Sequence, residues 1–468
     1  MHRTVVLNVV GLTGRLIGEH TPRLRAWLRE GAMARIRPAF PAVTCTAQSN
    51  YLTGQPPSVH GIVGNGWYDR TLAEVHFWKQ SNHLVGAPKL WERLRERQPG
   101  LTCAKLFWWF NMYSSADWSI TPRPMYPADG RKIFDIYTWP YDIRPAIKRD
   151  LGEFPFATFW GPAAGVDSPA GPPDAASRWI ARAARWIEER HRPTLSLVYL
   201  PHLDYGFQRH GPDASEAAAD LGRIDAIVGE LIDFFRERGV RVVVLSEYGL
   251  VPVRRPVHLN RRFRREGWLA LKEELGRELL DCGACRAFAV ADHQVAHVYV
   301  REEELLPAVR EVLSGEPGVA RVLGPTDKAA LGLDHPRAGD LIAIAEPDAW
   351  FTYYYWEDDA RAPDFAPTVD IHRKPGYDPV ELFTRPDWPA WRLKAHVAWR
   401  LLQKKLGFRM LMDVIPLDAT LVRGSHGALP EDPADWPVLL TKQAGLLEDD
   451  EMESTAVCGC LERHVLGG

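Results

Sequence analysis

The sequence predicts an α/β fold built on a doubly wound, mostly parallel sheet with helices on both faces. Three observations predict it. Short runs of Val, Ile and Leu alternate along the chain with amphipathic stretches of helical length. These runs are apolar almost throughout, as expected of parallel strands that are covered on both faces. The chain has 468 residues, of which 46% are hydrophobic and 25% charged, the balance of a globular protein.

The first strand is expected over residues 5–10, an apolar run that Asn8 interrupts. A helix is expected over residues 22–30. After Pro41 the sequence predicts a helix that begins near Thr44 and is ended by Gly54, a residue type favoured just past helix ends. The later core elements are expected to be a helix over 175–189, a strand over 195–200, a helix over 217–238 and a strand over 240–245.

Two aromatic-rich regions, at about 64–165 and 260–390, interrupt this alternation. We expect one α/β domain over residues 1–468, with these regions inserted as a cap over the sheet. Trp108–Trp109 and Tyr353–Tyr355 are candidates to hold the organic part of a ligand, and a place in the core beneath long loops is the alternative. The acidic segment at about 445–468 is expected to be a solvated tail.

Composition excludes several classes of protein. Lys and Arg number 57 against 60 Asp and Glu, which gives a net charge of −3, so no nucleic-acid partner is expected. No apolar run is long enough to span a membrane, and no signal peptide is evident, so we expect a cytoplasmic protein without a membrane partner. The 6 cysteines are too few for a disulfide scaffold, and the pairs Cys282/Cys285 and Cys458/Cys460 are either incidental thiols or a zinc site.

Polar residues stand at the ends of three predicted strands. Asn8 ends the first strand, His202 and Asp204 follow the second, and Glu247 with Tyr248 follows the third. Ligands of parallel α/β sheets bind beyond the carboxyl ends of the strands, so these side chains are expected to share one crevice. If the second strand continues, His202 and Asp204 point the same way.

Thr44 is expected at the start of a helix, where free backbone N–H groups and the positive end of the helix dipole lie. The setting suits a hydroxyl that only caps the helix. It equally suits a nucleophile that attacks a phosphate group.

The segment from Phe40 to Asn65, with Pro41-Ala42-Val43-Thr44, Leu52-Thr53-Gly54 and His60-Gly61-Ile62-Val63-Gly64-Asn65, resembles the nucleophile region of the alkaline phosphatase superfamily. It is most similar to the type I phosphodiesterase/nucleotide pyrophosphatase branch. The resemblance extends to Asp204, to Glu247-Tyr248-Gly249 and to Gly424-Ser425-His426-Gly427.

The resemblance implies a hydrolase with two divalent metal ions, commonly zinc, in which a Thr or Ser attacks phosphorus and a covalent intermediate is then hydrolysed. Thr44 matches the nucleophile. Asp204 and His426 match two ligands of the second ion. The expected metal ligands are Asp204, Glu247 and His426, with Asn8 and Gln208 as weaker ligands or as residues that contact the ligands.

The chain departs from the family pattern at several of these positions. Asn8 stands for an Asp, Glu247-Tyr248 for Asp-His, and Gln208 for a His. Ala47 stands for an Asn that binds phosphate, a role that Gln48 or Asn50 would have to take. Amide and phenol oxygens are poor zinc ligands, so Mn²⁺ or Mg²⁺ is an alternative to Zn²⁺. The site is expected to hold one such ion or two. Further ligand or substrate contacts are expected from among Tyr248, His202, His258, His293, His297 and His372.

The basic run Arg254–Arg265 follows the third strand end. It is either a solvated helix face or an electrostatic funnel for an anionic substrate.

We therefore expect a metal-dependent hydrolase of phosphoric esters, similar to phosphodiesterases and nucleotide pyrophosphatases, that acts on a small-molecule phosphoester through Thr44. The alternative is a non-catalytic relative that binds a ligand or partner after losing metal ligands. A third possibility is an altered hydrolase with one metal ion and a sulfate, phosphonate or monoester substrate.

Overall fold

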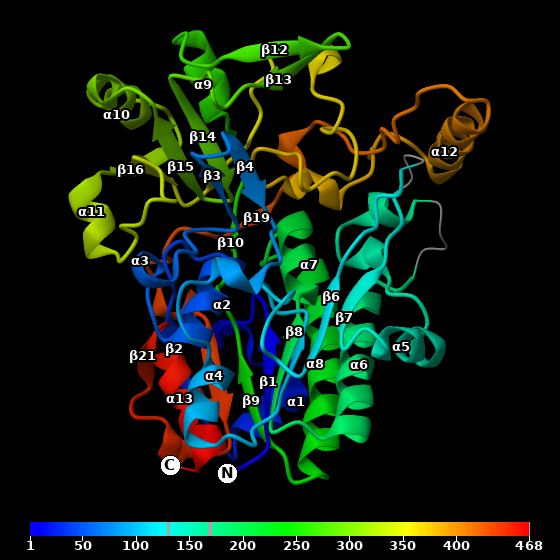
Figure 1. The fold of residues 1–468 in the computed structure, drawn as a ribbon, viewed down its shortest axis with the longest axis vertical. Helices are drawn as coiled ribbons and strands as arrows, with labels where there is room; N and C mark the ends of the chain where they lie inside the picture. The colour runs from blue at the N-terminus through cyan, green and yellow to red at the C-terminus, as the bar shows by residue number, and fades with distance from the viewer. Residues whose placement is uncertain (129–131, 167–170, 468) are drawn as a thin grey trace.

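The computed structural model describes residues 1–128, 132–166 and 171–467. These residues form two main sheets, stacked along the long axis of the molecule (Figure 1), and four sheets of two strands each. The larger sheet has nine strands and the smaller has four. Across the larger sheet the strands follow the order β21 (Glu451–Glu453), β2 (Ala32–Arg37), β20 (Val438–Thr441), β9 (Arg241–Leu245), β1 (Thr4–Val9), β8 (Leu195–Leu200), β5 (Cys103–Leu106), β6 (Trp118–Pro122) and β7 (Ile136–Trp139).

The centre of the larger sheet is parallel. β1 pairs in parallel with β8 and β9, and Asn8 lies beside Tyr199 on one neighbour and Leu245 on the other. β5 continues the parallel arrangement between β8 and β6. Antiparallel pairs occur toward the edges, where β20 pairs with β9 and β2, and β6 pairs with β7. The carboxyl ends of β1, β8 and β9 therefore meet at one edge of the sheet.

Helices cover both faces of this sheet, which confirms the doubly wound α/β class (Figure 1). One face carries α1 (Pro22–Leu28), α6 (Ala175–His191) and α8 (Ser215–Arg236). The other carries α2 (Thr44–Thr53), α4 (Leu90–Arg97) and α13 (Ala456–Leu466). The expected strands and helices of the core are confirmed to within a few residues at their ends.

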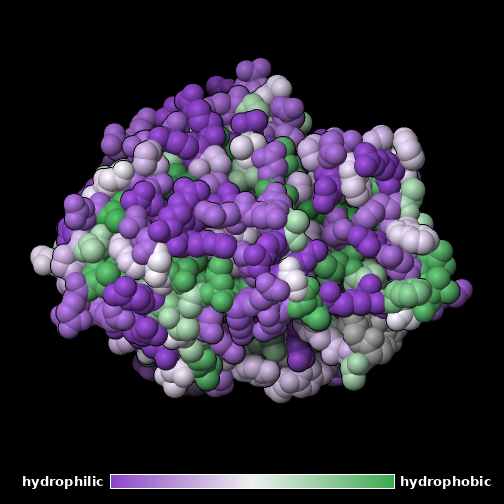
Figure 2. Space-filling model, turned by 90° about the horizontal axis from the view of Figure 1, so that it is seen from above, coloured by the Kyte–Doolittle hydropathy of each residue, from purple (hydrophilic) through white to green (hydrophobic). Residues whose placement is uncertain are grey.

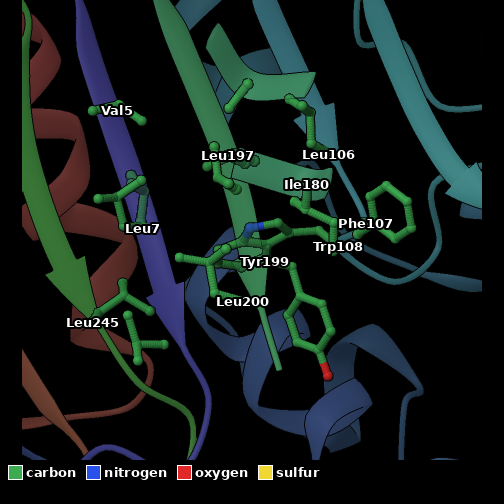
Figure 3. Packing of buried hydrophobic residues seen from close by; sticks show 14 of the residues in the cluster. Val5, Leu7, Leu106, Phe107, Trp108, Ile180, Leu197, Tyr199, Leu200 and Leu245 are labelled. Atoms are coloured by element: carbon green, nitrogen blue, oxygen red, sulfur yellow. The ribbon is translucent and has the colours of Figure 1, made fainter. Parts of the chain in front are cut away.

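The core of the sheet is aliphatic because the central strands are buried on both sides. Val5, Leu7, Leu197 and Leu245 are fully buried and pack together (Figure 3). Tyr199, near the end of β8, extends its phenol away from these aliphatic side chains (Figure 3). The carboxyl edge is thus where the apolar core gives way to polar groups.

The smaller sheet, which the sequence did not predict, lies beyond that edge (Figure 1). It is antiparallel, in the order β14 (Ala287–Asp292), β15 (Val295–Val300), β17 (Leu341–Ala345) and β16 (Val319–Leu323), and has its own hydrophobic core. The remaining elements are α3 (Pro57–His60), β3 (Gly66–Asp69), β4 (Glu74–Phe77), α5 (Ile143–Leu151), α7 (His202–His210), β10 (Val251–Pro252), β11 (Arg255–Val257), α9 (Leu259–Arg265), β12 (Leu271–Glu274), β13 (Arg277–Leu280), α10 (Leu306–Ser314), α11 (Pro325–Ala330), β18 (Ala349–Phe351), α12 (Ala390–Lys405) and β19 (Gly424–Ser425).

Two expectations about the outer regions are corrected. The segment 445–467 is not a free tail, because it supplies the edge strand β21 and helix α13, whose Cys458, Cys460 and Leu461 are buried. Tyr353–Tyr355 do not line a ligand pocket, since they are buried in a hydrophobic cluster with Trp350 and Trp356. No helix in the described ranges is long and apolar enough to cross a membrane.

Candidate functional site

Residues at the ends of β8 and β9 line one small cavity with about 70 Å³ of free space. Eight of its lining side chains are aromatic rings other than histidine, namely Trp78, Trp109, Phe159, Trp160, Tyr199, Tyr205, Tyr248 and Tyr377. The others are Thr44, Asp204, His293, Ile371, Asp378, Glu381, Leu382 and His426. No Lys or Arg of the described chain is among these lining residues.

Thr44 lies on the wall of this cavity as the first residue of α2. The residue that caps the helix is Val43, in extended conformation, and the Thr44 hydroxyl makes no capping hydrogen bond. Asn65 fixes the start of the helix instead, because its side-chain oxygen accepts the Cys45 N–H at 3.0 Å. Gly54 ends the helix with φ of 68°, as expected. The hydroxyl of Thr44 is therefore available to the cavity.

A hydrogen-bonded chain links Thr44 to a carboxyl group. The Thr44 hydroxyl lies 3.0 Å from the Tyr248 phenol, which donates to Asp204 Oδ1 at 3.3 Å. Since the phenol has one hydrogen, Thr44 is the donor to Tyr248. Burial raises the pKa of Asp204 to about 7, although hydrogen bonds from Gln208 and Tyr248 oppose the rise. Asp204 can thus accept a proton near neutral pH.

Glu247 is held by two amides. Asn8 Nδ2 and Gln48 Nε2 both donate to Glu247 Oε1 at 2.5 Å. The Trp109 N–H donates to Gln48 Oε1 at 2.7 Å, which fixes the direction of that amide. Burial raises the pKa of Glu247 to about 8 against these hydrogen bonds, so the group is mostly uncharged at neutral pH. Its Oε2 has no hydrogen-bond partner within the described part of the chain.

Four rings form a stack beside these carboxyl groups. Tyr248 lies 3.7 Å from His426, His426 lies 3.8 Å from His293, and His293 lies 4.0 Å from Tyr377, between ring centroids. Because His426 Nδ1 lies 2.7 Å from the carbonyl of Ala42, that nitrogen carries the hydrogen. His293 Nδ1 donates to the Asp292 carboxylate at 2.9 Å in the same way.

Both histidines are neutral, and the second ring nitrogen of each, Nε2, takes no part in these Nδ1 hydrogen bonds. Burial lowers the pKa of His293 to about 3, and burial, followed by the proximity of His293, holds the pKa of His426 well below its usual range. Their Nε2 atoms have no hydrogen-bond partner among residues that the structure describes. His426 Nε2 lies 3.7 Å from Asp204 Oδ1, too far for a hydrogen bond.

Gln208 joins Asp204 to the ring stack. Its Nε2 donates to Asp204 Oδ2 at 2.8 Å, and its Oε1 accepts from the Tyr377 hydroxyl at 3.0 Å. The amide oxygen that would face a metal ion is thus already used. Gly376 lets the Tyr377 loop approach β14, because a Cβ at that position would lie 3.0 Å from the carbonyl oxygen of Ala291.

The donor set does not fit the two-ion site that the family resemblance implies. At the position of the first ion, Asn8 directs N–H toward Glu247, and a phenol replaces an imidazole. At the second, Gln208 directs N–H toward Asp204. Over residues 1–128, 132–166 and 171–467 no three His, Cys, Asp or Glu side chains are grouped so that they could hold a metal ion. The same result leaves the cysteine pairs without a zinc site.

Several candidate residues lie away from the cavity. The chain turns into helix α7 at His202, so His202 and Asp204 do not alternate as in a strand, and His202 Nε2 lies 3.0 Å from Asp220 instead. His258 Nδ1 bonds to Thr352 at 2.7 Å, and His372 Nδ1 lies 3.3 Å from the carbonyl of Phe77. His297 Nε2 bonds to the carbonyl of Val63, also outside the cavity lining.

The basic run Arg254–Arg265 does not reach the cavity. Arg255 pairs with Glu346 and Asp348, Arg264 with Glu278, and Arg265 with Glu357. These ion pairs agree with the interpretation of the run as a solvated helix face, and not as an electrostatic funnel for an anionic substrate.

Sequence reasoning gave one residue at the site the wrong role and missed two others. Gln48 was a candidate for contact with phosphate, whereas its amide holds Glu247. Asp378 and Glu381 line the cavity and both pair with the buried Lys374, at 2.7 Å for Asp378. In the sequence, Asp378 follows Lys374 by four residues and Glu381 follows Asp378 by three, a spacing that allows ion pairs. Such spacings are common in a chain with this many charged residues, so this one does not indicate a site.

Known phosphodiesterases and pyrophosphatases are similar to this chain in sequence. The sequence profile of the type I phosphodiesterase/nucleotide pyrophosphatase family matches residues 4–378. An uncharacterised pyrophosphatase/phosphodiesterase of Schizosaccharomyces pombe is 23% identical over 226 residues, 46% of this chain and 37% of that protein. Human ectonucleotide pyrophosphatase/phosphodiesterase family member 1 is 23% identical over 227 residues, 46% of this chain and 19% of that protein. The matched segments thus span about a third and about a fifth of these relatives.

Solved structures show the same fold over nearly the whole chain. Inactive murine ectonucleotide pyrophosphatase/phosphodiesterase 5 in complex with AMP has a TM-score of 0.58 at 14% identity, covering 100% of this chain and 95% of that chain. Phosphonoacetate hydrolase from Sinorhizobium meliloti 1021 in complex with phosphonoformate has a TM-score of 0.58 at 13% identity, covering 99% and 96%.

Proposed function

The chain belongs to the type I phosphodiesterase/nucleotide pyrophosphatase family, and from this premise we propose that it hydrolyses phosphoric esters of small organic molecules with Thr44 as the nucleophile. The observation that carries the proposal is the Thr44 hydroxyl, which does not cap its helix and lies on the cavity wall, bonded to Tyr248. A hydroxyl with a proton acceptor behind it, at a helix N-terminus, is suited to attack phosphorus.

In the first step Thr44 Oγ1 bonds to phosphorus and the ester bond to the leaving oxygen breaks. The proton of Thr44 passes through the Tyr248 phenol to Asp204, whose pKa of about 7 suits a general base. The leaving oxygen takes a proton from water. In the second step water attacks phosphorus, the bond from phosphorus to the Thr44 oxygen breaks, and Asp204 returns its proton through Tyr248 to that oxygen. The attacking water gives one proton to solvent, where it neutralises the hydroxide that the first step left.

The charge of the phosphate group is met by the helix and by neutral acids. The N-terminus of α2 places the positive end of its dipole at the reacting hydroxyl, while the Cys45 N–H stays bonded to Asn65. Because burial keeps Glu247 largely protonated at neutral pH, it does not repel an anion, and its Oε2 is free to donate a hydrogen bond. Glu247 thereby offers a donor where family members have a metal ligand.

Enzymes of this family depend on divalent metal ions, but the amide and phenol groups of this chain do not fit the pair of ions. We therefore propose that turnover needs no divalent metal ion, which revises the metal dependence that the sequence predicted.

The aromatic lining favours a substrate with a flat or apolar organic part. The AMP bound to the murine relative has such a ring. We propose that Trp78, Trp109 and Tyr377 contact that part of the substrate.

The test is hydrolysis of a chromogenic phosphodiester and the matching monoester, with EDTA and with added Zn²⁺, Mn²⁺ or Mg²⁺. Wild type should turn over a substrate in EDTA, Thr44→Ser should retain part of the rate, and Thr44→Ala should lose it. Thr46→Ala, two residues along the same helix and outside the cavity lining, is the matched control and should keep its rate. Equal rates in wild type and Thr44→Ala would refute the nucleophile, and a strict need for added metal would refute the metal-independent site.

A second candidate function is a binding protein without turnover. The replaced metal ligands favour this function. The cavity lining favours it too, because among the described residues it contains three carboxyl groups and no Lys or Arg. Calorimetric titration with AMP separates the two, since saturable binding without product at any metal would establish the binder.

A further inference from the structure

Helix α12 turns its apolar residues outward. It lies apart from both sheets (Figure 1), and the one side chain buried along its 16 residues is that of Val397. Trp391 is 72% exposed, Trp399 55%, Leu402 45% and Leu406, directly after the helix, 62%. Figure 2 shows hydrophobic side chains gathered at the right-hand end of the molecule, the side on which α12 lies in Figure 1.

The exposed apolar residues form a continuous stripe. At about 100° per residue, one arc of about 100° contains Trp391, Ala395, Ala398, Trp399, Leu402 and Leu406. The side facing the protein is mixed: Val397 and Leu393 pack against a hydrophobic cluster, and His396 and Arg400 both bond to Asp413, at 2.8 Å for each. An ordinary surface helix has one apolar stripe, which faces the core, whereas α12 has a second one that faces outward.

Basic residues border the stripe. By the same angular count Arg392 lies on one side of it, and Lys394 and Lys405 lie on the other. The helix sequence Ala390–Lys405 contains no Asp or Glu. Among the described residues no carboxylate lies within ion-pair distance of Arg392, Lys394, Lys404 or Lys405, although Arg400 is paired with Asp413. These cations are thus available to a partner, although the Arg392 guanidinium also lies 4.9 Å from the centre of the Trp388 ring.

We propose that α12 is an interfacial helix by which this protein docks on a membrane that carries anionic lipids. Trp and Leu side chains in one stripe suit the boundary between headgroups and acyl chains, and a Lys/Arg border suits acidic headgroups. The helix lies on the surface and does not cross it, in agreement with the absence of a spanning helix from the described ranges. The proposal revises the expectation that no membrane partner exists, which rested on the lack of a spanning segment.

Charge complementarity favours a lipid surface over a second copy of the chain. Pairing two stripes would bring Arg392, Lys394 and Lys405 against like charges, which opposes association. The broad apolar stripe with two exposed Trp residues is also unlike a phosphate-binding surface for nucleic acid, where cations and not aliphatic side chains predominate.

The test is co-sedimentation of the full chain with vesicles of phosphatidylcholine, alone or mixed with phosphatidylserine. We expect at least about tenfold tighter binding to the anionic vesicles, weakened by added salt. Two variants remove the two contributions separately, Trp391→Ser/Trp399→Ser for the stripe and Arg392→Glu/Lys394→Glu/Lys405→Glu for its border. Both should lose most of the sedimented fraction while thermal unfolding stays unchanged, because these side chains are exposed.

Leu275→Ser and Arg321→Glu, at exposed positions on β-hairpin and strand surfaces away from α12, are the matched controls and should sediment as wild type does. Equal binding of wild type and both α12 variants would overturn the proposal, as would no binding to anionic vesicles at low salt. A concentration-dependent dimer that Trp391→Ser/Trp399→Ser dissociates would assign the stripe to self-association instead.

Discussion

Tyr248 is the residue on which the proposed chemistry depends most. Its phenol stands between Thr44 and Asp204, and its ring stacks on His426 at 3.7 Å. A phenylalanine keeps the stack and removes the proton path. We expect Tyr248→Phe to lower kcat by about 10², the effect of losing positioned acid–base help, with little change in KM. Steady-state kinetics on the chromogenic substrate check this, and an unchanged kcat would exclude the relay.

The rate should follow a bell-shaped dependence on pH. Asp204 must be ionised to accept the proton, so kcat/KM should rise as pH passes about 7. Glu247 acts as a neutral donor, so the rate should fall as pH passes about 8. In Glu247→Gln the alkaline limb should disappear while the acid limb stays. Retention of both limbs in that variant would show that Glu247 does not set the profile.

Glu247 should also make stability depend on pH. Its pKa is raised in the folded state from 4.5 to about 8, so its contribution is fully present below about pH 4.5 and is lost as pH rises through about 8. At about 1.4 kcal/mol per pKa unit the change is roughly 3 to 5 kcal/mol. Urea unfolding at pH 5 and pH 8 should show a smaller loss in Glu247→Gln than in wild type. Identical losses would mean that the carboxyl is not held in its neutral form.

At the scale of elements, the loop that carries Tyr377, Asp378 and Glu381 is fixed by one buried cation. Lys374 Nζ bonds to Asp378 and Glu381, and Glu381 has a pKa raised to about 7, chiefly by burial. Lys374→Met leaves two carboxyl groups buried without their partner, which costs about 3 to 5 kcal/mol. The free energy of unfolding in urea checks this, with Lys272→Met on the exposed strand β12 as control. A loss below about 1 kcal/mol would show that the cluster is hydrated.

The sequence predicted those strands and helices that are specified by a short continuous stretch of residues. The strands ending in Asn8 and Glu247 were evident because their apolar runs are continuous, and the helix from Thr44 to Gly54 was evident from its end residue. The direction of His202 was mispredicted because the chain enters α7 directly after β8, a choice that tertiary packing makes. Gln48 and Gln208 were placed in the right region, but their bonds to carboxyl groups depend on contacts distant in sequence.

At the scale of the whole molecule, the cavity takes residues from both sheets. Thr44, Asp204 and Tyr248 come from the edge of the larger sheet, and His293 comes from the turn between β14 and β15 of the smaller. The smaller sheet was missed because its strands lie between arginine-rich and aromatic loops, and its pairing is set by distant contacts. We propose that the chain is one domain, so calorimetry should show a single unfolding transition. Two separated transitions would assign the sheets to independent domains.

The central claim is that Thr44 becomes covalently phosphorylated during turnover. The most direct measurement is acid quenching of the enzyme with a phosphodiester in EDTA, followed by peptide mass spectrometry. The account predicts a phosphoryl or phosphoryl-ester adduct on the peptide that carries Thr44, present in wild type and Tyr248→Phe and absent in Thr44→Ala. Turnover without any adduct on Thr44 in wild type, or an adduct that persists on another residue in Thr44→Ala, would contradict it.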